Sequence, residues 1–321
     1  MEKLEQLQQT LREVDERVPA AFRLALGRLG DRLYAPPSPA EEEEDDVANF
    51  VASLLLPPPP ATEAAEDDSC LALAEAEPDD DGTQPGTDLR LLCGSCYVPH
   101  HDHDAHFVAH AGAGVFGVAD GVGAYMLYGV DAGAFSRGLM ESARGEASAA
   151  APPVSPYALL EVAHEKTVAS GAPGASTAAI LSLAGGGRVL KWAYVGDSGF
   201  AVVRGGRIAR RSTPQRHFYT EAPFQLAGDT RNSDGAACAS VGEAAARAGD
   251  VVVAGTDGLF DNVGDAQLER AVMMGTELGF SPKNMADVIA GVAYEASRRP
   301  GGGGKPDDIT VVVAFVVPSE S

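Results

Sequence analysis

An α+β fold, in which helices cover a largely antiparallel sheet, is predicted by the pattern of residues 88–321. Short apolar and often β-branched runs alternate there with glycine turns of hairpin length, such as 185–187 and 205–206. Blocks of strands separated by helices favour this class over a repeating βαβ pattern. The predicted strands are 115–119, 178–183, 189–195, 200–203, 251–254 and 309–317.

Helices are predicted where apolar residues recur at helical spacing, over 131–147, 156–170 and 282–298. Proline stands at the start of the last two, where its fixed φ angle and missing N–H group are well tolerated.

The composition excludes several classes of protein. The 321 residues include 46 acidic and 24 basic side chains, a formal net charge of -22, which phosphate backbones and anionic membranes repel. We therefore expect no nucleic-acid partner. No apolar run reaches the roughly 18 residues of a membrane span. The four cysteines and the lack of a secretory signal favour a cytoplasmic or nuclear protein.

Residues 1–87 differ in composition from the rest of the chain. They hold 21 acidic and six basic side chains, net -15, whereas residues 88–321 carry a net charge of -7. Apolar residues at helical spacing before Pro19 predict one or two short amphipathic helices that pack on the main domain or bind a partner. The remaining acidic, proline-rich segment should stay mobile. Residues 88–321 are expected to form one domain, and the protein a monomer.

Aspartates stand at the ends of three predicted strands. Asp120 and Asp257 each follow a strand and precede a glycine, and Asp307 and Asp308 precede the last strand. A packed sheet holds such a carboxylate rigidly within reach of solvent, and hard divalent cations prefer oxygen ligands. Because Asp-Gly is also favourable turn chemistry, the three sites indicate a metal centre only when taken together.

Five segments resemble, in order, the motifs of the metal-dependent protein phosphatase 2C (PPM) family. They are FGVADGVGAY (116–125), STAAILSL (176–183), WAYVGDSGFAVVR (192–204), GDVVVAGTDGLFDNV (249–263) and KPDDITVVV (305–313). The segment QRHFYTEAPFQL (215–226) is similar to the compact branch common in plants. The resemblance covers none of residues 1–87.

This resemblance implies a four-layer α-β-β-α sandwich, two Mg²⁺ or Mn²⁺ ions per subunit, and hydrolysis of phosphoserine and phosphothreonine in a phosphoprotein substrate. Matched residue by residue, Asp120 would bridge the ions, Gly121 would donate its backbone carbonyl, and Asp257 and Asp307 would complete the metal site. Asp120 and Asp257 would be catalytic, and Asp308 ranks behind Asp307. Two such ions, roughly 3.5 to 4 Å apart, lower the pKa of a shared water and attract phosphate.

Some residues depart from the family pattern. Where the family usually has Glu-Asp-Ala, this chain has His103-Asp104-Ala105. Imidazole is a softer ligand that favours Mn²⁺ over Mg²⁺, and Asp102 or Asp104 would compensate for the missing glutamate. No arginine matches the phosphate-binding arginine of some members. A catalytically weak or inactive phosphatase fold that binds phosphoproteins or partners is therefore the alternative. Asp197 matches an aspartate associated with a further, weakly held metal.

Cys93 and Cys96 precede a run of histidines and raise the possibility of a zinc site with His100 and His101 or His103. Zinc ligand pairs are normally separated by a longer loop, so a surface loop is the favoured interpretation. Four arginines, at positions 204, 207, 210 and 211, concentrate basic charge on one predicted hairpin. A solvated face is favoured there over a substrate dock.

Overall fold

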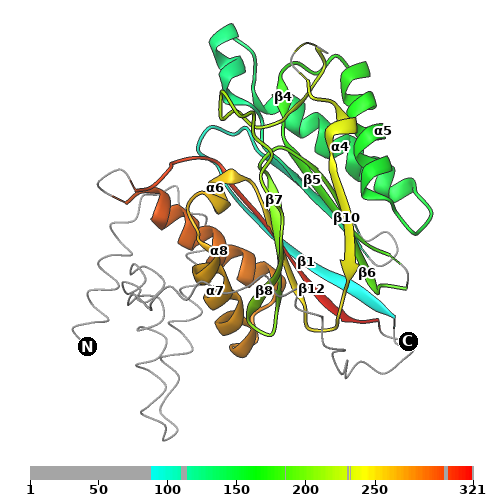
Figure 1. Cartoon of the computed structure of the whole chain (residues 1–321), viewed down its shortest axis with the longest axis vertical. Helices are drawn as coiled ribbons and strands as arrows, with labels where there is room; N and C mark the ends of the chain where they lie inside the picture. The colour runs from blue at the N-terminus through cyan, green and yellow to red at the C-terminus, as the bar shows by residue number, and fades with distance from the viewer. Residues whose placement is uncertain are drawn as a thin grey trace, which may run out of the picture.

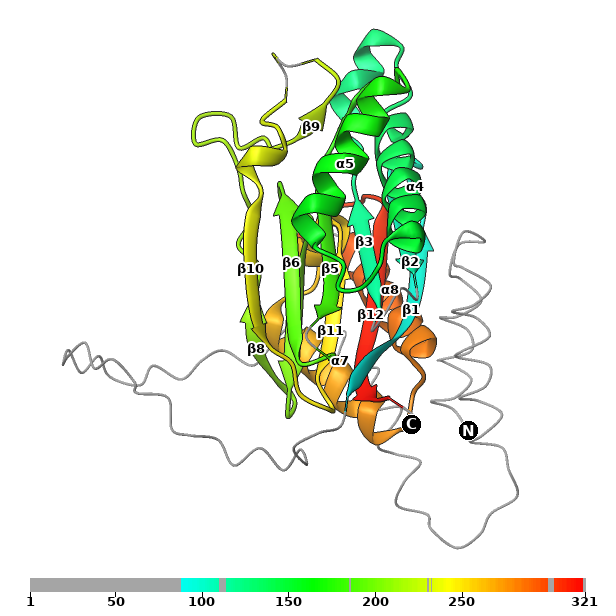
Figure 2. The same cartoon turned by 90° about the vertical axis from the view of Figure 1, so that its right-hand side faces the viewer.

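Two five-stranded antiparallel sheets stack face to face, and helices cover the outer face of each (Figures 1 and 2). The structure, a computed structural model, describes residues 88–109, 114–184, 186–229, 231, 233–299 and 303–319. The helices and the acidic, proline-rich segment predicted within residues 1–87 lie outside these residues.

The strands of both sheets pair antiparallel throughout. From edge to edge, sheet A contains β1 (Leu89–Val98), β12 (Ile309–Pro318), β11 (Val251–Gly255), β7 (Gly199–Arg204) and β8 (Arg207–Arg211). Sheet B contains β10 (Ser240–Ala245), β6 (Val189–Val195), β5 (Ala178–Ala184), β3 (Val115–Ala119) and β2 (Ala105–Ala109). A small third sheet pairs β4 (Ala175–Ser176) with β9 (Leu226–Ala227).

Helices form the outer layers. Sheet B is covered by α4 (Gly133–Ala149) and α5 (Pro156–Ala169), and sheet A by α7 (Asp265–Glu277) and α8 (Pro282–Ser297). Ser155 and Ser281 cap α5 and α8, because their hydroxyl groups accept hydrogen bonds from backbone N–H groups of the first turn. Shorter turns are η1 (Gly123–Tyr128), η2 (Ala236–Cys238) and α6 (Asp257–Phe260).

Apolar side chains fill the three spaces between the four layers. Every residue of β3, β5 and β11 is buried, which explains why these strands read as continuous apolar runs in the sequence. The interlayer clusters include Phe116, Phe200 and Val312 between the sheets, Phe135 and Leu160 from α4 and α5 against sheet B, and Leu268 and Ile289 from α7 and α8 against sheet A. The predicted α-β-β-α sandwich is confirmed. Within the described part of the chain, no helix is long and apolar enough to cross a membrane.

The six predicted strands and three predicted helices are present with small shifts at their ends. The predicted strands did not include β1, β2, β4, β9 or β10, and no helix was predicted at α7; β8 was implied only as the second arm of the hairpin that turns at 205–206. β8 (RIARR) and β10 (SVGEAA) lie at sheet edges, where polar side chains replace the apolar run that predicts a buried strand.

The surface loop expected at Cys93 and Cys96 is wrong, because both residues lie within β1. Their odd spacing sends the side chains to opposite faces of the strand. Cys96 packs under α8, and Cys93 packs against the cluster between the sheets. The two thiols therefore cannot converge on one zinc ion, and in the described residues no group of three or more His, Cys, Asp or Glu is arranged to hold a metal.

The arginines of the β7–β8 hairpin are mostly engaged with acidic or aromatic partners. Arg204 binds the buried Asp250 at 2.7 Å, and Arg207 binds Glu269 at 3.1 Å. Arg211 lies over the ring of Phe260, with its guanidinium carbon 3.7 Å from the ring centroid. The Arg207 and Arg211 contacts tie the hairpin to α7 and α6, and the Arg204 contact ties it to the turn before β11.

Candidate active site

The β2–β3 hairpin places two aspartates at the same end of its ladder. Ala105, the first residue of β2, pairs with Ala119, the last residue of β3, so Asp104 and Asp120 stand just beyond that pair. Their carboxyl groups are close enough for one to hydrogen-bond the other when it carries a proton.

Sheet A brings two more aspartates to this point. Gly255 pairs with Val311, so Asp257, which follows β11, and Asp307, which precedes β12, lie at a common end of that ladder. The negative charges of Asp257 and Asp307 both act on Asp120 and raise its pKa. The start of α6 and the segment before β12 mark this end at the upper left of Figure 1.

Asp104 joins the two sheets. Its Oδ2 atom accepts hydrogen bonds from the hydroxyl groups of Thr256 and Thr310, each at 2.8 Å. The Thr256 hydroxyl oxygen in turn accepts the backbone N–H of Thr310 at 3.1 Å. This buried network fixes the end of sheet B against the ends of β11 and β12.

Both Asp-Gly pairs need glycine for close packing. A Cβ atom on Gly121 would lie 2.2 Å from the carbonyl oxygen of Ala132, and one on Gly258 would lie 2.0 Å from the carbonyl oxygen of Asp308. Any side chain at either position would push these backbone segments apart. The glycines therefore let the loops that carry Asp120 and Asp257 approach their neighbours.

Negative charge accumulates among these aspartates. Burial raises the pKa of Asp120 well above its ordinary value, and the neighbouring Asp104, Asp257 and Asp307 raise it further. Burial, followed by the charge of Asp307, raises the pKa of Asp257 to about 7. Burial also raises the pKa of Asp104 and of Asp307. Carboxylates in such surroundings favour the approach of a positive charge.

The donor set suits a hard divalent cation. Asp104 Oδ1 and Asp257 Oδ1 are buried and have no hydrogen-bond partner among the described residues. Buried acceptors rarely stay unpaired, and carboxylate oxygens are what Mg²⁺ and Mn²⁺ prefer. Among the described residues, no group of three or more His, Cys, Asp or Glu is already arranged to hold a metal.

Asp308 has a different environment from Asp307. Its Oδ1 accepts the backbone N–H groups of His100, of His101 at 2.9 Å and of Asp102 at 3.0 Å, and its Oδ2 accepts that of His103 at 2.7 Å. Burial alone would raise the pKa of Asp308, but these donors hold it below its ordinary value. Asp308 therefore organises the loop that leads to Asp104.

His103 is fixed mainly through its backbone. Its carbonyl oxygen accepts hydrogen bonds from the N–H of Gly121, at 3.1 Å, and from the hydroxyl of Ser136. Its buried ring stacks on that of His101, with centroids 5.4 Å apart, and lies beside Gly123. The structure thus places His103 at the site's edge.

Asp197, in the turn between β6 and β7, is bound by an arginine. Arg216 contacts Asp197 Oδ2 through Nη2 at 3.1 Å and through Nε at 3.2 Å, and it lies 3.6 Å from Asp261. Burial raises the pKa of Asp197, and the Arg216 charge opposes that rise. Besides burial and the charge of Asp307, the charges of Asp197 and Asp261 raise the pKa of Asp257, and the charge of Arg216 lowers it. This ion-paired group therefore borders the site.

Thr256, Thr310 and Arg216 are parts of this region that the sequence did not predict. Thr256 and Thr310 stand beside strand-end aspartates, a position that gives a weak signal. Nothing in the local sequence indicates that Arg216 pairs with Asp197.

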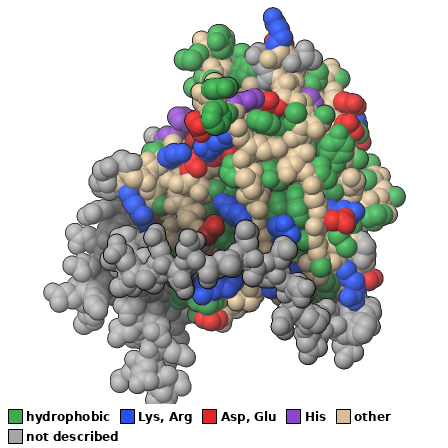
Figure 3. Space-filling view, in the orientation of Figure 1, with side chains coloured by type: hydrophobic (Ala, Val, Ile, Leu, Met, Phe, Trp, Pro, Cys, Tyr) green, Lys and Arg blue, Asp and Glu red, His purple; other side chains and the backbone are tan. Residues whose placement is uncertain are grey.

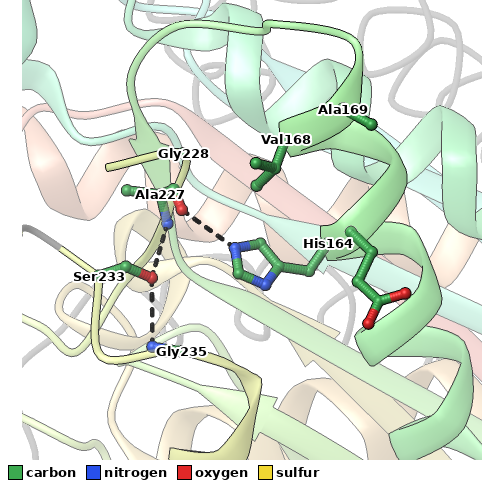
Figure 4. Close-up of a pocket in the computed structure, with 8 residues that line it drawn as sticks. His164, Val168, Ala169, Ala227, Gly228, Ser233 and Gly235 are labelled. Carbon is green, nitrogen blue, oxygen red and sulfur yellow. Dashed lines mark hydrogen bonds between the residues drawn. The ribbon is translucent and has the colours of Figure 1, made fainter. Parts of the chain in front are cut away.

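A separate pocket of about 410 Å³ opens between α5 and the segment around β9 (Figure 4). His164 points across it, and its Nε2 donates to the carbonyl oxygen of Ala227 at 3.1 Å. The aspartates described above do not line this pocket.

Curated proteins have sequences similar to that of this chain. A rice (Oryza sativa subsp. japonica) protein named "Putative protein phosphatase 2C 23" is 48% identical over 100% of this chain and 99% of its own length. The human (Homo sapiens) "Protein phosphatase PTC7 homolog" is 35% identical over 72% of this chain and 84% of its own. No family model matches the chain.

Solved structures share the fold. The photosystem II phosphatase PBCP superposes with a TM-score of 0.62 at 29% identity, over 70% of this chain and 98% of its own. The catalytic domain of the serine/threonine phosphatase PstP, solved with two manganese ions, gives a TM-score of 0.55 at 24% identity, over 71% of this chain and 99% of its own.

The four-layer sandwich and these relatives define the chain as a protein phosphatase. It belongs to the protein phosphatase 2C family.

Proposed function

We propose that the chain hydrolyses phosphoserine and phosphothreonine in proteins with the help of two Mg²⁺ or Mn²⁺ ions. The observation that carries this proposal is the meeting of strand-end carboxylates from both sheets. Two buried oxygens among them, on Asp104 and Asp257, have no described hydrogen-bond partner. Family membership supplies the class of reaction.

The proposed metal ligands are Asp120, the backbone carbonyl of Gly121, Asp257 and Asp307, with Asp104 and His103 as further candidates at the edge. When bound, the two ions supply Lewis acidity toward a phosphate group and a water of lowered pKa. Asp120 and Asp257 are the proposed catalytic residues because they stand at the facing ends of β3 and β11.

The other residues of the site hold this arrangement in place. The Thr256 and Thr310 hydroxyl groups orient Asp104, and Asp308 orients the loop before it. Because these contacts are made within the folded chain, Asp104 and the loop before it are held in place before a phosphate arrives.

Asp197 and Asp308 fit a ligand role less well. Arg216 neutralises Asp197, so a further cation there would have to displace the guanidinium. Asp308 already accepts four backbone N–H groups. We therefore propose Asp307 ahead of Asp308 as the ligand from this pair.

A catalytically weak or inactive phosphatase fold is the second candidate. It is favoured by His103, which stands where the family usually has glutamate and whose ring stacks on His101. In that case the site would bind a phosphorylated partner without cleaving it.

We further propose that the protein is a monomer in the cytoplasm or nucleus. Light scattering would measure its oligomeric state, and localisation of a tagged chain would measure its compartment.

The test is release of phosphate from a phosphothreonine peptide by the purified full chain with Mn²⁺ or Mg²⁺. Asp257→Asn and EDTA should each remove the activity. Asp265→Asn, at an exposed aspartate of α7 that pairs with Arg211, is the matched control and should keep it. Release that is no faster in the wild type than in Asp257→Asn rejects the enzyme and leaves the binding module.

A further inference from the structure

The most exposed large apolar side chains lie on two turns beside the proposed site. Among the described residues, four such side chains have between 81% and 93% of their surface exposed: Leu127, Tyr128, Phe218 and Tyr219. Met126 adjoins the first pair and is also exposed. We call these five residues the apolar rim. Within each turn the exposed apolar side chains are neighbours, and such groups mark interaction surfaces.

The first part of the rim is η1, which begins two residues after Gly121. Its start is anchored because the backbone N–H of Val122 donates to Ala175 at 2.9 Å. Gly129, in the left-handed conformation at φ 70°, closes the turn. Met126, Leu127 and Tyr128 are therefore presented on a fixed turn.

The second part lies in the segment between β8 and β9. Phe218 is two residues beyond Arg216 in the sequence, so their Cα atoms are at most about 7 Å apart. Arg216 is held by Asp197 and Asp261 beside Asp257. The Phe218 and Tyr219 rings pack edge to face, with centroids 5.1 Å apart.

The two parts border the site from different sides. Figure 2 shows the segment before β9 on one side of the upper end of the sandwich and the turns before α4 on the other. Figure 3 shows apolar side chains at the upper left, close to histidine and acidic side chains. A polypeptide that presents a phosphate to the carboxylates would pass over one or both parts.

We propose that the apolar rim docks the residues that flank the phosphorylated serine or threonine, so that substrates with large apolar flanking residues are preferred. This inference rests on the proposed function. Arg216, the basic side chain nearest the rim in the sequence, is already paired with Asp197 and Asp261, and Glu221 follows Tyr219 by two residues, so acidic flanks are disfavoured. The net charge of -22 also disfavours an anionic membrane or a second copy as the occupant.

The test compares kcat/KM of the full chain, with Mn²⁺, on two phosphothreonine peptides. One carries leucine and phenylalanine on both sides of the phosphothreonine, and the other carries glycine and serine. The apolar peptide should be preferred about tenfold, the gain expected from burying one large apolar side chain. p-Nitrophenyl phosphate, which is too small to reach the rim, reports the metal site separately.

Two double variants locate the preference. Leu127→Ser with Tyr128→Ser, and Phe218→Ser with Tyr219→Ser, should each reduce it while p-nitrophenyl phosphate turnover stays unchanged. Val241→Ser, at a 58% exposed residue on β10, is the control and should leave the preference intact. Equal kcat/KM for the two peptides, or a preference that survives in both double variants, overturns the proposal.

Peptide binding separates this proposal from the proposed function. If the chain hydrolyses neither peptide nor p-nitrophenyl phosphate, fluorescence anisotropy of the same peptides, with the same variants, gives the comparison without turnover. Equal affinity for the two peptides overturns the docking proposal. Binding to anionic vesicles, or a dimer in sedimentation, that is lost in the double variants would assign the rim to a membrane or a second copy and also overturn it.

Discussion

Asp104, at the end of sheet B, accepts a hydrogen bond from the hydroxyl of Thr256, at the end of sheet A, at 2.8 Å. The same oxygen accepts the hydroxyl of Thr310. The proposed metal ligands come from both sheets, so their spacing depends on how the sheets are held together here. Asp104 is therefore a structural link as well as a candidate ligand.

Removing either hydroxyl should destabilise the fold. Thr256→Val and Thr310→Val keep the side-chain shape but each take a donor from the buried Asp104 carboxylate, which costs about 1–3 kcal/mol in the free energy of unfolding. Urea titrations measure this cost. Thr276→Val removes a hydroxyl that bonds only within α7 and should cost less. Equal losses in all three variants would contradict the special role of the Asp104 network.

Substitution of Asp307 should mainly affect Mn²⁺ binding, whereas substitution of Asp308 should mainly affect stability. Asp307→Ala should abolish Mn²⁺ binding in calorimetry with little change in stability. Asp308→Ala removes the acceptor for four backbone N–H groups and should lower stability by about 1–3 kcal/mol, with Mn²⁺ affinity weakened less. Loss of Mn²⁺ binding in Asp308→Ala alone would exchange the two roles.

Arg216→Ala should leave the buried Asp197 without its countercharge. Because the arginine side chain is partly exposed, we expect a loss of about 1–2 kcal/mol in unfolding free energy, below that of a fully buried pair. Arg207→Ala, at an exposed pair with Glu269, should cost less than about 0.5 kcal/mol. Adding Asp197→Asn to Arg216→Ala should recover part of the loss, and its failure to do so would refute the pairing as the cause.

The thiols of β1 should be unreactive in the folded chain. Burial raises the pKa of Cys93 and of Cys96 to about 12, so at pH 8 the reactive thiolate is scarcer than for an ordinary cysteine. Cys238 is exposed. Iodoacetamide followed by peptide mass mapping should label Cys238 before Cys93 and Cys96, which should react only on unfolding. Equal labelling rates would show that β1 opens in the native state.

The sequence was sufficient for the strands that are buried on both faces. Such strands, β3 and β11 among them, appear as apolar runs, and the aspartates at their ends could be found directly. Edge strands such as β10 could not be predicted, since one side meets solvent and few of their residues are apolar and buried. The surface loop predicted at Cys93 and Cys96 was wrong because a glycine and a serine interrupt the apolar pattern of β1.

Contacts between distant parts of the chain had no local signal. The Asp308 carboxylate accepts backbone N–H groups that are more than 200 residues away in the sequence. Arg216, which follows β8, pairs with Asp197 in the β6–β7 turn. Such pairs arise from how the sheets stack, which neither periodicity nor motif spacing specifies. The family resemblance ranked Asp307 ahead of Asp308, and the hydrogen bonds of Asp308 add a physical reason for that order.

The central claim is that the aspartates at the ends of β3, β11 and β12 hold two divalent cations. Diffraction at the manganese absorption edge, from crystals of the full chain grown with MnCl₂, tests it most directly. The account predicts two anomalous peaks beside Asp120, one or both also contacting Asp257 or Asp307, and their loss in Asp120→Asn. Crystals of the wild type with no peak at these aspartates, or with manganese only at the histidines before β2, would contradict it.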